Sequence, residues 1–187
     1  VVSEAELAEQ VGVDCFGVGE HHRKDFAISA PEVMLAAIAG RTERMILGSA
    51  VTVLSTDDPV RVFQRFSTLN AISNGRAEVI LGRGSFTESY PLFGFDLSRY
   101  DELFEEKLQE LLAIRKGGKV TWEGSTHTKP IPAMEIYPKP VQDPLPLWIA
   151  VGGTPNSVAR AAYFALPLMI AIIGGRPQQF QPLVQLY

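Results

Sequence analysis

The stretch Met45–Leu54 constrains the fold more than any other feature of this sequence. It is rich in β-branched and apolar residues, and it contains no charged residue. A strand exposed on one face would alternate apolar and polar side chains, whereas a strand that is apolar throughout belongs in a parallel sheet covered on both faces. Parallel strands need long crossover connections, which are usually helices. This stretch therefore predicts an α/β fold.

Segments with strand and helix patterns alternate along most of the chain. The predicted strands are Val13–Gly19, Met45–Leu54, Ala77–Leu81, Leu147–Val151 and Leu166–Ile173. The predicted helices are Ser3–Gln10, Pro31–Arg41, Val60–Ile72, Arg99–Lys116 and Pro155–Ala165. This order indicates a parallel sheet, either a (β/α) barrel or an open doubly wound sheet. A barrel of eight units takes roughly 250 residues, so we expect about five of its eight strands here.

Residues 117–146 depart from this alternation. They hold six of the thirteen prolines of the chain. Short strand-like pieces are predicted at Val120–Trp122 and Met134–Tyr137. We expect this segment to be an excursion over the barrel, within a single domain that covers residues 1–187.

The composition narrows the possible partners and compartment. A net charge of −4, with 46% hydrophobic and 20% charged residues, is typical of a globular protein and gives no support to a nucleic-acid partner. The single cysteine, Cys15, excludes an intrachain disulfide framework and fits a reducing compartment. Its apolar surroundings predict a buried, inert thiol. No apolar run has the length of a membrane span, so a cytoplasmic protein is expected.

Two of the three histidines stand side by side after the first predicted strand, next to a carboxylate, in the sequence Glu20-His21-His22. The carboxyl ends of strands are where a (β/α) barrel places its active site. An imidazole suits acid–base catalysis, but adjacent histidines also form structural hydrogen bonds, and the residue types leave both roles open. Neighbours on a strand point to opposite faces, so a metal site shared by the pair is not expected. His127, in the proline-rich segment, is expected to be solvated.

Two glycine-rich turns after later strands suit an anion. In Gly82–Gly84, the guanidinium of Arg83 is better placed for a phosphate than for packing, although a simple tight turn would also need the glycines. In Gly152–Pro155, Thr154 suits a helix N-cap and Pro155 suits the first helical position. The free N–H groups of that helix would then face a ligand. These turns predict a local phosphate site.

Taken in order, these motifs resemble the luciferase-like flavin-dependent monooxygenases, the family that includes the bacterial luciferase α subunit. The matching segments are Gly19–His22, Arg41–Arg44, Leu47–Leu54, Asp58–Arg61, Leu69–Arg76, Gly82–Gly84, Phe93–Gly94, Val151–Thr154 and Leu166–Leu168. The resemblance implies a TIM barrel that binds reduced FMN at the carboxyl ends of its strands and uses O₂ to oxidise a small organic substrate. It also implies that the first strand precedes Val1 and that the last units follow Tyr187.

The resemblance further implies roles for single residues. His21 matches the active-site histidine near the flavin, and Glu20 and His22 are its neighbours in the catalytic motif. The peptide bond between Ala50 and Val51 falls where family members have a non-proline cis bond under the flavin ring. The residues implied for FMN binding are Ala50, Val51, Gly82, Arg83, Gly152, Gly153, Thr154 and Ser157.

Two other functions stay open at this point. A related branch of the same barrel uses a deazaflavin for hydride transfer, and a flavin-binding module without catalysis is the second alternative. The expected partners are a small-molecule substrate, a flavin reductase that supplies reduced FMN, and a second copy of the chain. The helices over residues 31–41 and 59–72 carry more apolar residues than one buried face can use. They predict a homodimer in which Phe63 or Phe66 is an anchor.

Overall fold

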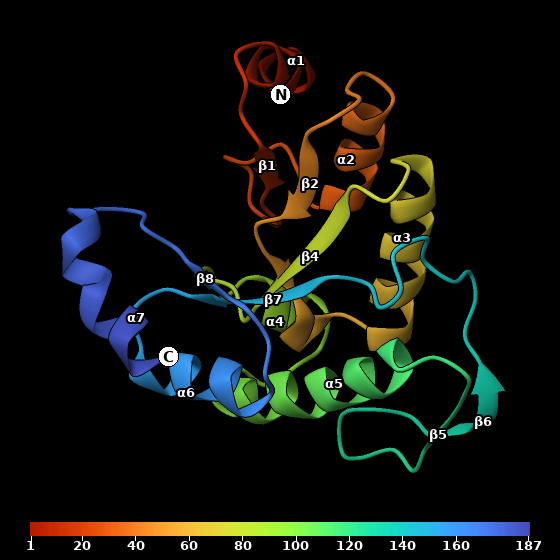
Figure 1. The fold of residues 1–187 in the computed structure, drawn as a ribbon. Helices are drawn as coiled ribbons and strands as arrows, with labels where there is room; N and C mark the ends of the chain where they lie inside the picture. Colours follow the sequence, from red (N-terminus) through yellow and green to blue (C-terminus); the bar gives the residue numbers. More distant parts are fainter.

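A parallel sheet forms the centre of the computed structural model, which describes residues 1–187 (Figure 1). The strands are β1 (Cys15–Val18), β2 (Ile46–Ser49), β3 (Thr52–Val53), β4 (Ala77–Gly82), β7 (Leu147–Val151) and β8 (Leu168–Ile170). The order in the sheet is β1-β2-β4-β7-β8, every pair is parallel, and β3 pairs with the end of β4. The order of these strands in the sheet is the same as their order in the chain, which is the arrangement of a (β/α) barrel, and the sheet forms half of one. The predicted fold is therefore confirmed.

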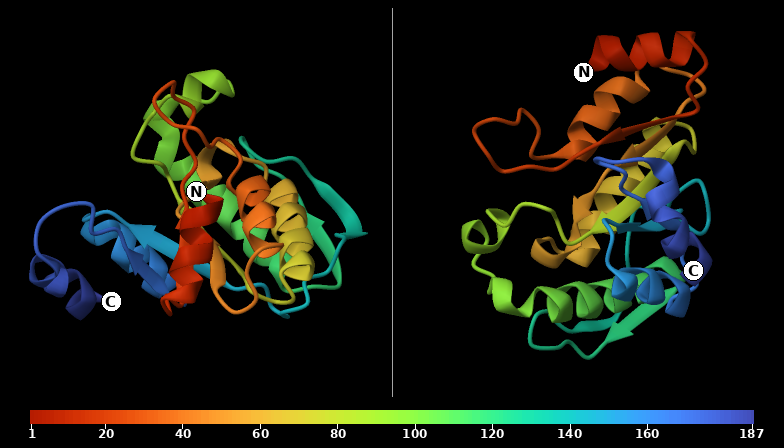
Figure 2. Two further views of the ribbon diagram at one scale, coloured as in Figure 1. Left: turned by 90° about the horizontal axis from the view of Figure 1, so that it is seen from above. Right: turned by 90° about the vertical axis from the view of Figure 1, so that its left-hand side faces the viewer.

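Helices connect the strands and cover one face of the sheet. They are α1 (Val2–Gln10), α2 (Pro31–Ala39), α3 (Pro59–Ile72), α4 (Ser89–Leu92), α5 (Tyr100–Arg115), α6 (Pro155–Tyr163) and α7 (Gln181–Leu186), with 3₁₀ turns η1 (Leu54–Thr56), η2 (Leu97–Arg99) and η3 (Pro177–Phe180). α2 and α3 run side by side (Figure 2). Asp58 caps α3 by accepting a hydrogen bond from the N–H of Arg61 at 2.9 Å. No helix combines the length and the apolar character that crossing a membrane requires.

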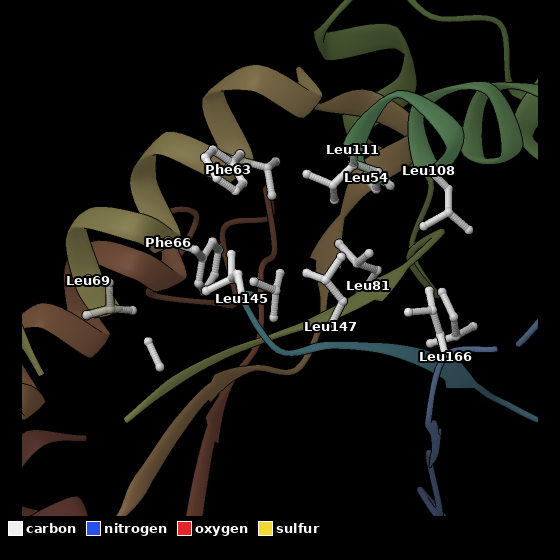
Figure 3. Packing of buried hydrophobic residues seen from close by; sticks show 14 of the residues in the cluster. Leu54, Phe63, Phe66, Leu69, Leu81, Leu108, Leu111, Leu145, Leu147 and Leu166 are labelled. Atoms are coloured by element: carbon white, nitrogen blue, oxygen red, sulfur yellow. The ribbon is translucent and has the colours of Figure 1, made fainter. Parts of the chain in front are cut away.

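The hydrophobic core lies between this helical layer and the sheet. Phe63 and Phe66 of α3 and Leu111 of α5 point toward Leu81 of β4 and Leu147 of β7 (Figure 3). All five side chains are buried. Alternate residues of each strand point toward the helices, because side chains alternate across a sheet. The other residues of each strand point to the opposite face.

Cys15 lies on that opposite face and is exposed, so the predicted buried thiol is wrong. Its neighbours Phe16 and Val18 pack against the core under the helices. Strand alternation therefore turns Cys15 away from them. The apolar character of the segment came from residues on the other face of the strand.

The stretch Met45–Leu54, predicted as one strand, is divided in the structure. β2 ends at Ser49, β3 covers only Thr52–Val53, and η1 begins at Leu54. At the break, the N–H of Ala50 donates to the carbonyl of Val18 at 2.7 Å, whereas β3 pairs with β4. β2 thus pairs with both β1 and β4, whereas β3 pairs with β4 alone, and composition could not place the break between the two pieces.

The proline-rich residues 117–146 contain an antiparallel hairpin of β5 (Lys119–Trp122) and β6 (Ile131–Glu135). It lies beside α5 on the helical side of the sheet, rather than over the strand ends (Figure 1). Gln64 of α3 joins it to the core by donating a hydrogen bond to the carbonyl of Tyr137 at 2.9 Å. His127, predicted to be solvated, is largely covered because the loop between β5 and β6 folds back on α5, so that prediction is wrong.

The two helices predicted to form a dimer interface use their largest side chains within this chain. Phe63 and Phe66 are buried in the core, so their predicted role as interface anchors is wrong. The outer face of the pair still carries exposed apolar residues, among them Val33 and Ile72. A homodimer through this outer face stays a prediction.

Candidate flavin site

The carboxyl ends of β1, β4 and β7 and the turn between β2 and β3 surround a cavity of about 270 Å³. The predicted residues that line it are Glu20, His21, Ala50, Val51, Gly82, Arg83, Gly152, Thr154 and Ser157. Gly153 stands in the same turn but does not line the cavity, and His22 lines a different one. The fold thus gathers most of the residues that the sequence selected, from segments far apart in the chain.

One end of this cavity suits an anion. Arg83 Nη2 donates a hydrogen bond to Ser157 Oγ at 2.9 Å, and Thr154 Oγ1 lies 2.8 Å from the same hydroxyl oxygen. Thr154 is the N-cap of α6, and Pro155 is its first residue. Pro155 has no N–H, and the N–H of Ser157 donates to the carbonyl of Thr154 at 3.0 Å, so α6 offers an anion the positive end of its dipole rather than a set of free N–H groups. A guanidinium, two hydroxyls and a helix N-terminus together favour a negative group such as a phosphate.

The guanidinium of Arg83 is held from several sides. Its Nη1 is paired with Asp101 of α5, which also accepts a hydrogen bond from Arg160 Nη2 at 3.0 Å. The guanidinium lies 4.6 Å from the centre of the Tyr100 ring, and the Arg83 carbonyl accepts a hydrogen bond from Tyr90 Oη at 3.0 Å. The side chain of Asp101 is 53% exposed, so solvent weakens its pairing with Arg83. An entering phosphate would compete with Asp101 for Arg83.

Small residues and backbone line the middle of the cavity. The peptide bond between Ala50 and Val51 is cis, as the resemblance predicts. A Cβ added at Gly82 would lie 2.7 Å from Val51 Cγ2, and one added at Gly17 would lie 2.9 Å from Ala50 Cβ. Packing therefore requires glycine at both positions. A surface of backbone and small side chains suits the approach of a planar ring.

His21 reaches the cavity from the loop after β1. Its ring centre lies 3.9 Å from that of Phe26 and 5.1 Å from that of Phe86. The backbone N–H of His21 donates to the carbonyl of Ile28 at 3.0 Å. Burial lowers the pKa of the imidazole, and the charge of Arg23 adds to this while Glu88 opposes it. The imidazole is therefore neutral at neutral pH and is able to accept a proton.

Glu20 and His22 form a pair that is separate from His21. Glu20 Oε1 lies 2.9 Å from His22 Nε2, and Oε2 accepts a hydrogen bond from the N–H of Val53 at 2.9 Å. Burial raises the pKa of the Glu20 carboxyl, while these two hydrogen bonds lower it. Both carboxyl oxygens are occupied, so Glu20 ties the end of β1 to β3. The predicted catalytic motif is thus divided, because His21 lines this cavity and His22 lines a different one.

Gly84, from the predicted glycine-rich turn, also lines the cavity, and sequence reasoning missed four further lining residues, namely Ser85, Ala150, Ala171 and Ile173. Strand alternation could have found Ala150, which stands two residues before Gly152 and shares its face. Ile173 stands two residues after Ala171 in the same way. The structure contains no group of three or more His, Cys, Asp or Glu side chains placed to hold a metal ion.

The residues present fit a phosphorylated ligand with a planar ring. The donors of Arg83, Ser157 and Thr154 stand at one end, small groups line the middle, and His21 enters beside them. A site of this kind at the carboxyl ends of parallel strands is typical of (β/α)-barrel domains that bind a phosphate-bearing coenzyme.

Comparison with known proteins agrees with this class. Residues 1–187 match the family model of the luciferase-like monooxygenases, and the chain belongs to this family. It is 30% identical over 173 residues to N-acetyl-S-alkylcysteine monooxygenase of Bacillus subtilis (strain 168), a match that covers 91% of this chain and 49% of the relative. The chain spans about half the length of the curated relatives it matches.

Solved structures share the fold. Monooxygenase RslO1 from Streptomyces bottropensis superposes with a TM-score of 0.88 at 25% identity, over 100% of this chain and 57% of that one. The oxygenating constituent of 3,6-diketocamphane monooxygenase from Pseudomonas putida, solved in complex with FMN, has a TM-score of 0.77 at 19% identity, over 90% of this chain and 50% of that one. The sheet described here is accordingly a partial luciferase-like barrel.

Proposed function

We propose that the whole protein containing this chain is a monooxygenase that uses reduced FMN and O₂ to oxidise a small organic substrate. The observation that carries the proposal is the meeting of Arg83, Ser157 and the N-terminus of α6 at one end of a cavity that His21 also lines. Family membership supports the same reading. One protein with this fold, the oxygenating constituent of 3,6-diketocamphane monooxygenase, was solved in complex with FMN.

Different residues of the cavity would bind the phosphate and the ring of FMN. Arg83 and Ser157 would hold the phosphate, helped by the Thr154 hydroxyl and the positive end of the α6 dipole. The cis peptide between Ala50 and Val51 would lie against the ring. When bound in its reduced form, FMN supplies the electrons with which O₂ is activated for oxidation of the substrate.

His21 would move a proton at the ring end of the site. Its imidazole is neutral at neutral pH because burial lowers its pKa, and the rings of Phe26 and Phe86 hold its orientation. A positioned imidazole that is able to accept and return a proton typically contributes about 10²–10⁴-fold to a rate. A flavin reductase would deliver the reduced coenzyme. In such a scheme this protein needs no second coenzyme site for flavin reduction.

An anaerobic titration of the whole protein with reduced FMN tests the coenzyme, with a deazaflavin coenzyme titrated in parallel. We expect tight binding of reduced FMN, and a rate of oxidation by O₂ that differs between the bound and the free flavin. Preference for the deazaflavin, which transfers hydride without O₂, would replace the proposal by the dehydrogenase-type alternative. Binding of FMN without any change in its reaction with O₂ would indicate a binding module.

A further inference from the structure

A second and larger cavity, of about 780 Å³, lies beside the candidate flavin site. It is enclosed by the N-terminal ends of α2 and α3, one face of α5 and the loop of the β5–β6 hairpin. Glu20 lines both cavities, whereas His21 lines only the first and His22 only the second. The second cavity is therefore a separate space next to the flavin site.

The face of α5 in this cavity carries two buried charged side chains, Lys107 and Glu110, which are 2% and 3% exposed. Lys107 is satisfied: its Nζ donates to the carbonyl of Ser55 at 2.8 Å and lies 3.8 Å from the centre of the Phe95 ring. Glu110 is not satisfied, because its buried Oε2 has no hydrogen-bond partner. A buried carboxyl without a partner is costly, so its persistence calls for a ligand.

The hairpin loop brings a second unpaired group to the same cavity. His127 Nε2 is buried and has no hydrogen-bond partner, and the nearest carboxylate oxygen, on Glu102, is 4.0 Å away. The next residue, Thr128, is already occupied, since Trp122 Nε1 donates to its hydroxyl at 2.8 Å. Arg65 Nε, in the same wall, also has no hydrogen-bond partner, but it forms an ion pair with Glu32. Glu110 and His127 are thus the two side chains of the cavity wall that have a buried atom with neither a hydrogen-bond partner nor an ion pair shorter than 4.0 Å.

The charges around the cavity favour a cation. Acidic side chains outnumber basic ones in its wall: Glu20, Glu32, Asp57 and Asp58 face Arg65, Lys107 and Lys129. Glu110 adds a fifth carboxyl, whose pKa burial raises to about 7, so a bound cation would favour its ionised form. Arg65 is already paired with both Glu32 and Asp57, and Lys129 is exposed at the rim. No set of side chains is placed to hold a metal ion, so the cation that fits is an organic one.

We propose that this cavity is a binding site for a small aliphatic amine. One N–H of its ammonium group would donate to the Glu110 carboxylate, and another would donate to His127. An ammonium brings both the positive charge and the N–H donors that these two side chains lack. The proposal does not depend on the coenzyme, because none of the residues that bind the amine lines the flavin cavity.

Calorimetric titration of the whole protein with n-butylammonium chloride tests this site, with sodium butyrate at equal ionic strength as the ligand of opposite charge. We expect the amine to bind and butyrate not to bind. Glu110→Gln should weaken amine binding by about 10- to 100-fold, the scale of one lost charge-assisted hydrogen bond. Glu105→Gln makes the same chemical change on α5 outside the cavity and should leave binding unchanged.

Three results would overturn the proposal: no amine binding, equal binding of butyrate, or full binding by the Glu110→Gln protein. Circular dichroism shows whether each variant folds. If Glu110→Gln does not fold, His127→Leu takes its place and should weaken amine binding several-fold. Unchanged affinity in that variant would equally refute the site.

Discussion

Replacing Arg83 by alanine should weaken FMN binding to the whole protein by about 10- to 150-fold. The guanidinium donates to Ser157 Oγ at 2.9 Å, next to the N-terminus of α6, and would reach a phosphate from the same position. A hydrogen bond to a charged group is worth about 1.5–3 kcal/mol, which converts to that range of affinity. The loss should be confined to ligands that carry the phosphate.

Flavin fluorescence measures the effect when FMN and riboflavin are titrated in parallel, because riboflavin has the same ring without the phosphate. Arg83→Ala should reduce affinity for FMN and leave that for riboflavin nearly unchanged. Arg99→Ala is a matched control, since Arg99 is exposed and pairs only with Glu102. Equal losses for both ligands, or no loss for FMN, would refute the assignment of the phosphate to Arg83.

His21→Ala should lower turnover by about 10²–10⁴-fold while FMN affinity is retained, and a variant that keeps its rate would make His21 structural. In wild-type protein, burial raises the pKa of Glu110 from 4.5 to about 7, so ionisation costs folding free energy and stability falls as pH rises through that window. In urea unfolding, the wild-type free energy of unfolding should fall between pH 5 and pH 8 by up to about 3 kcal/mol more than that of Glu110→Gln. The same pH dependence in both proteins would contradict this prediction. Val33→Glu, on the exposed face of α2, should dissociate the proposed homodimer in sedimentation experiments, while a wild-type protein that stays monomeric on concentration would exclude that dimer.

Sequence reasoning succeeded where one local pattern determines the outcome. Apolar strands, proline at the first turn of a helix and glycine-rich turns after strands are short-range features, and they placed the sheet and both ends of the candidate flavin site. Arg83 and Ser157 are far apart in the chain, but Arg83 directly follows β4 and Ser157 lies in the first turn of α6, the helix that follows β7. The topology of the barrel then brings them within 2.9 Å.

The errors came from features that depend on tertiary packing. Cys15 lies in an apolar segment, but strand alternation turns it to the face without helices. Phe66 has the apolar character of an interface residue, but its side chain is buried in the core of this chain. His127 stands in a polar, proline-rich loop, and only the folding of that loop onto α5 buries its Nε2 atom. The burial of Phe66 and of His127 cannot be determined from the spacing of neighbouring residues, and strand alternation leaves open which face of β1 the helices cover.

A crystal structure of the whole protein with bound FMN tests the central proposal most directly. We predict phosphate oxygens within about 3 Å of the Arg83 guanidinium and the Ser157 hydroxyl. The flavin ring should lie against the peptide between Ala50 and Val51, with the His21 imidazole facing it. A flavin bound outside this cavity, or a phosphate held by other residues, would contradict the account.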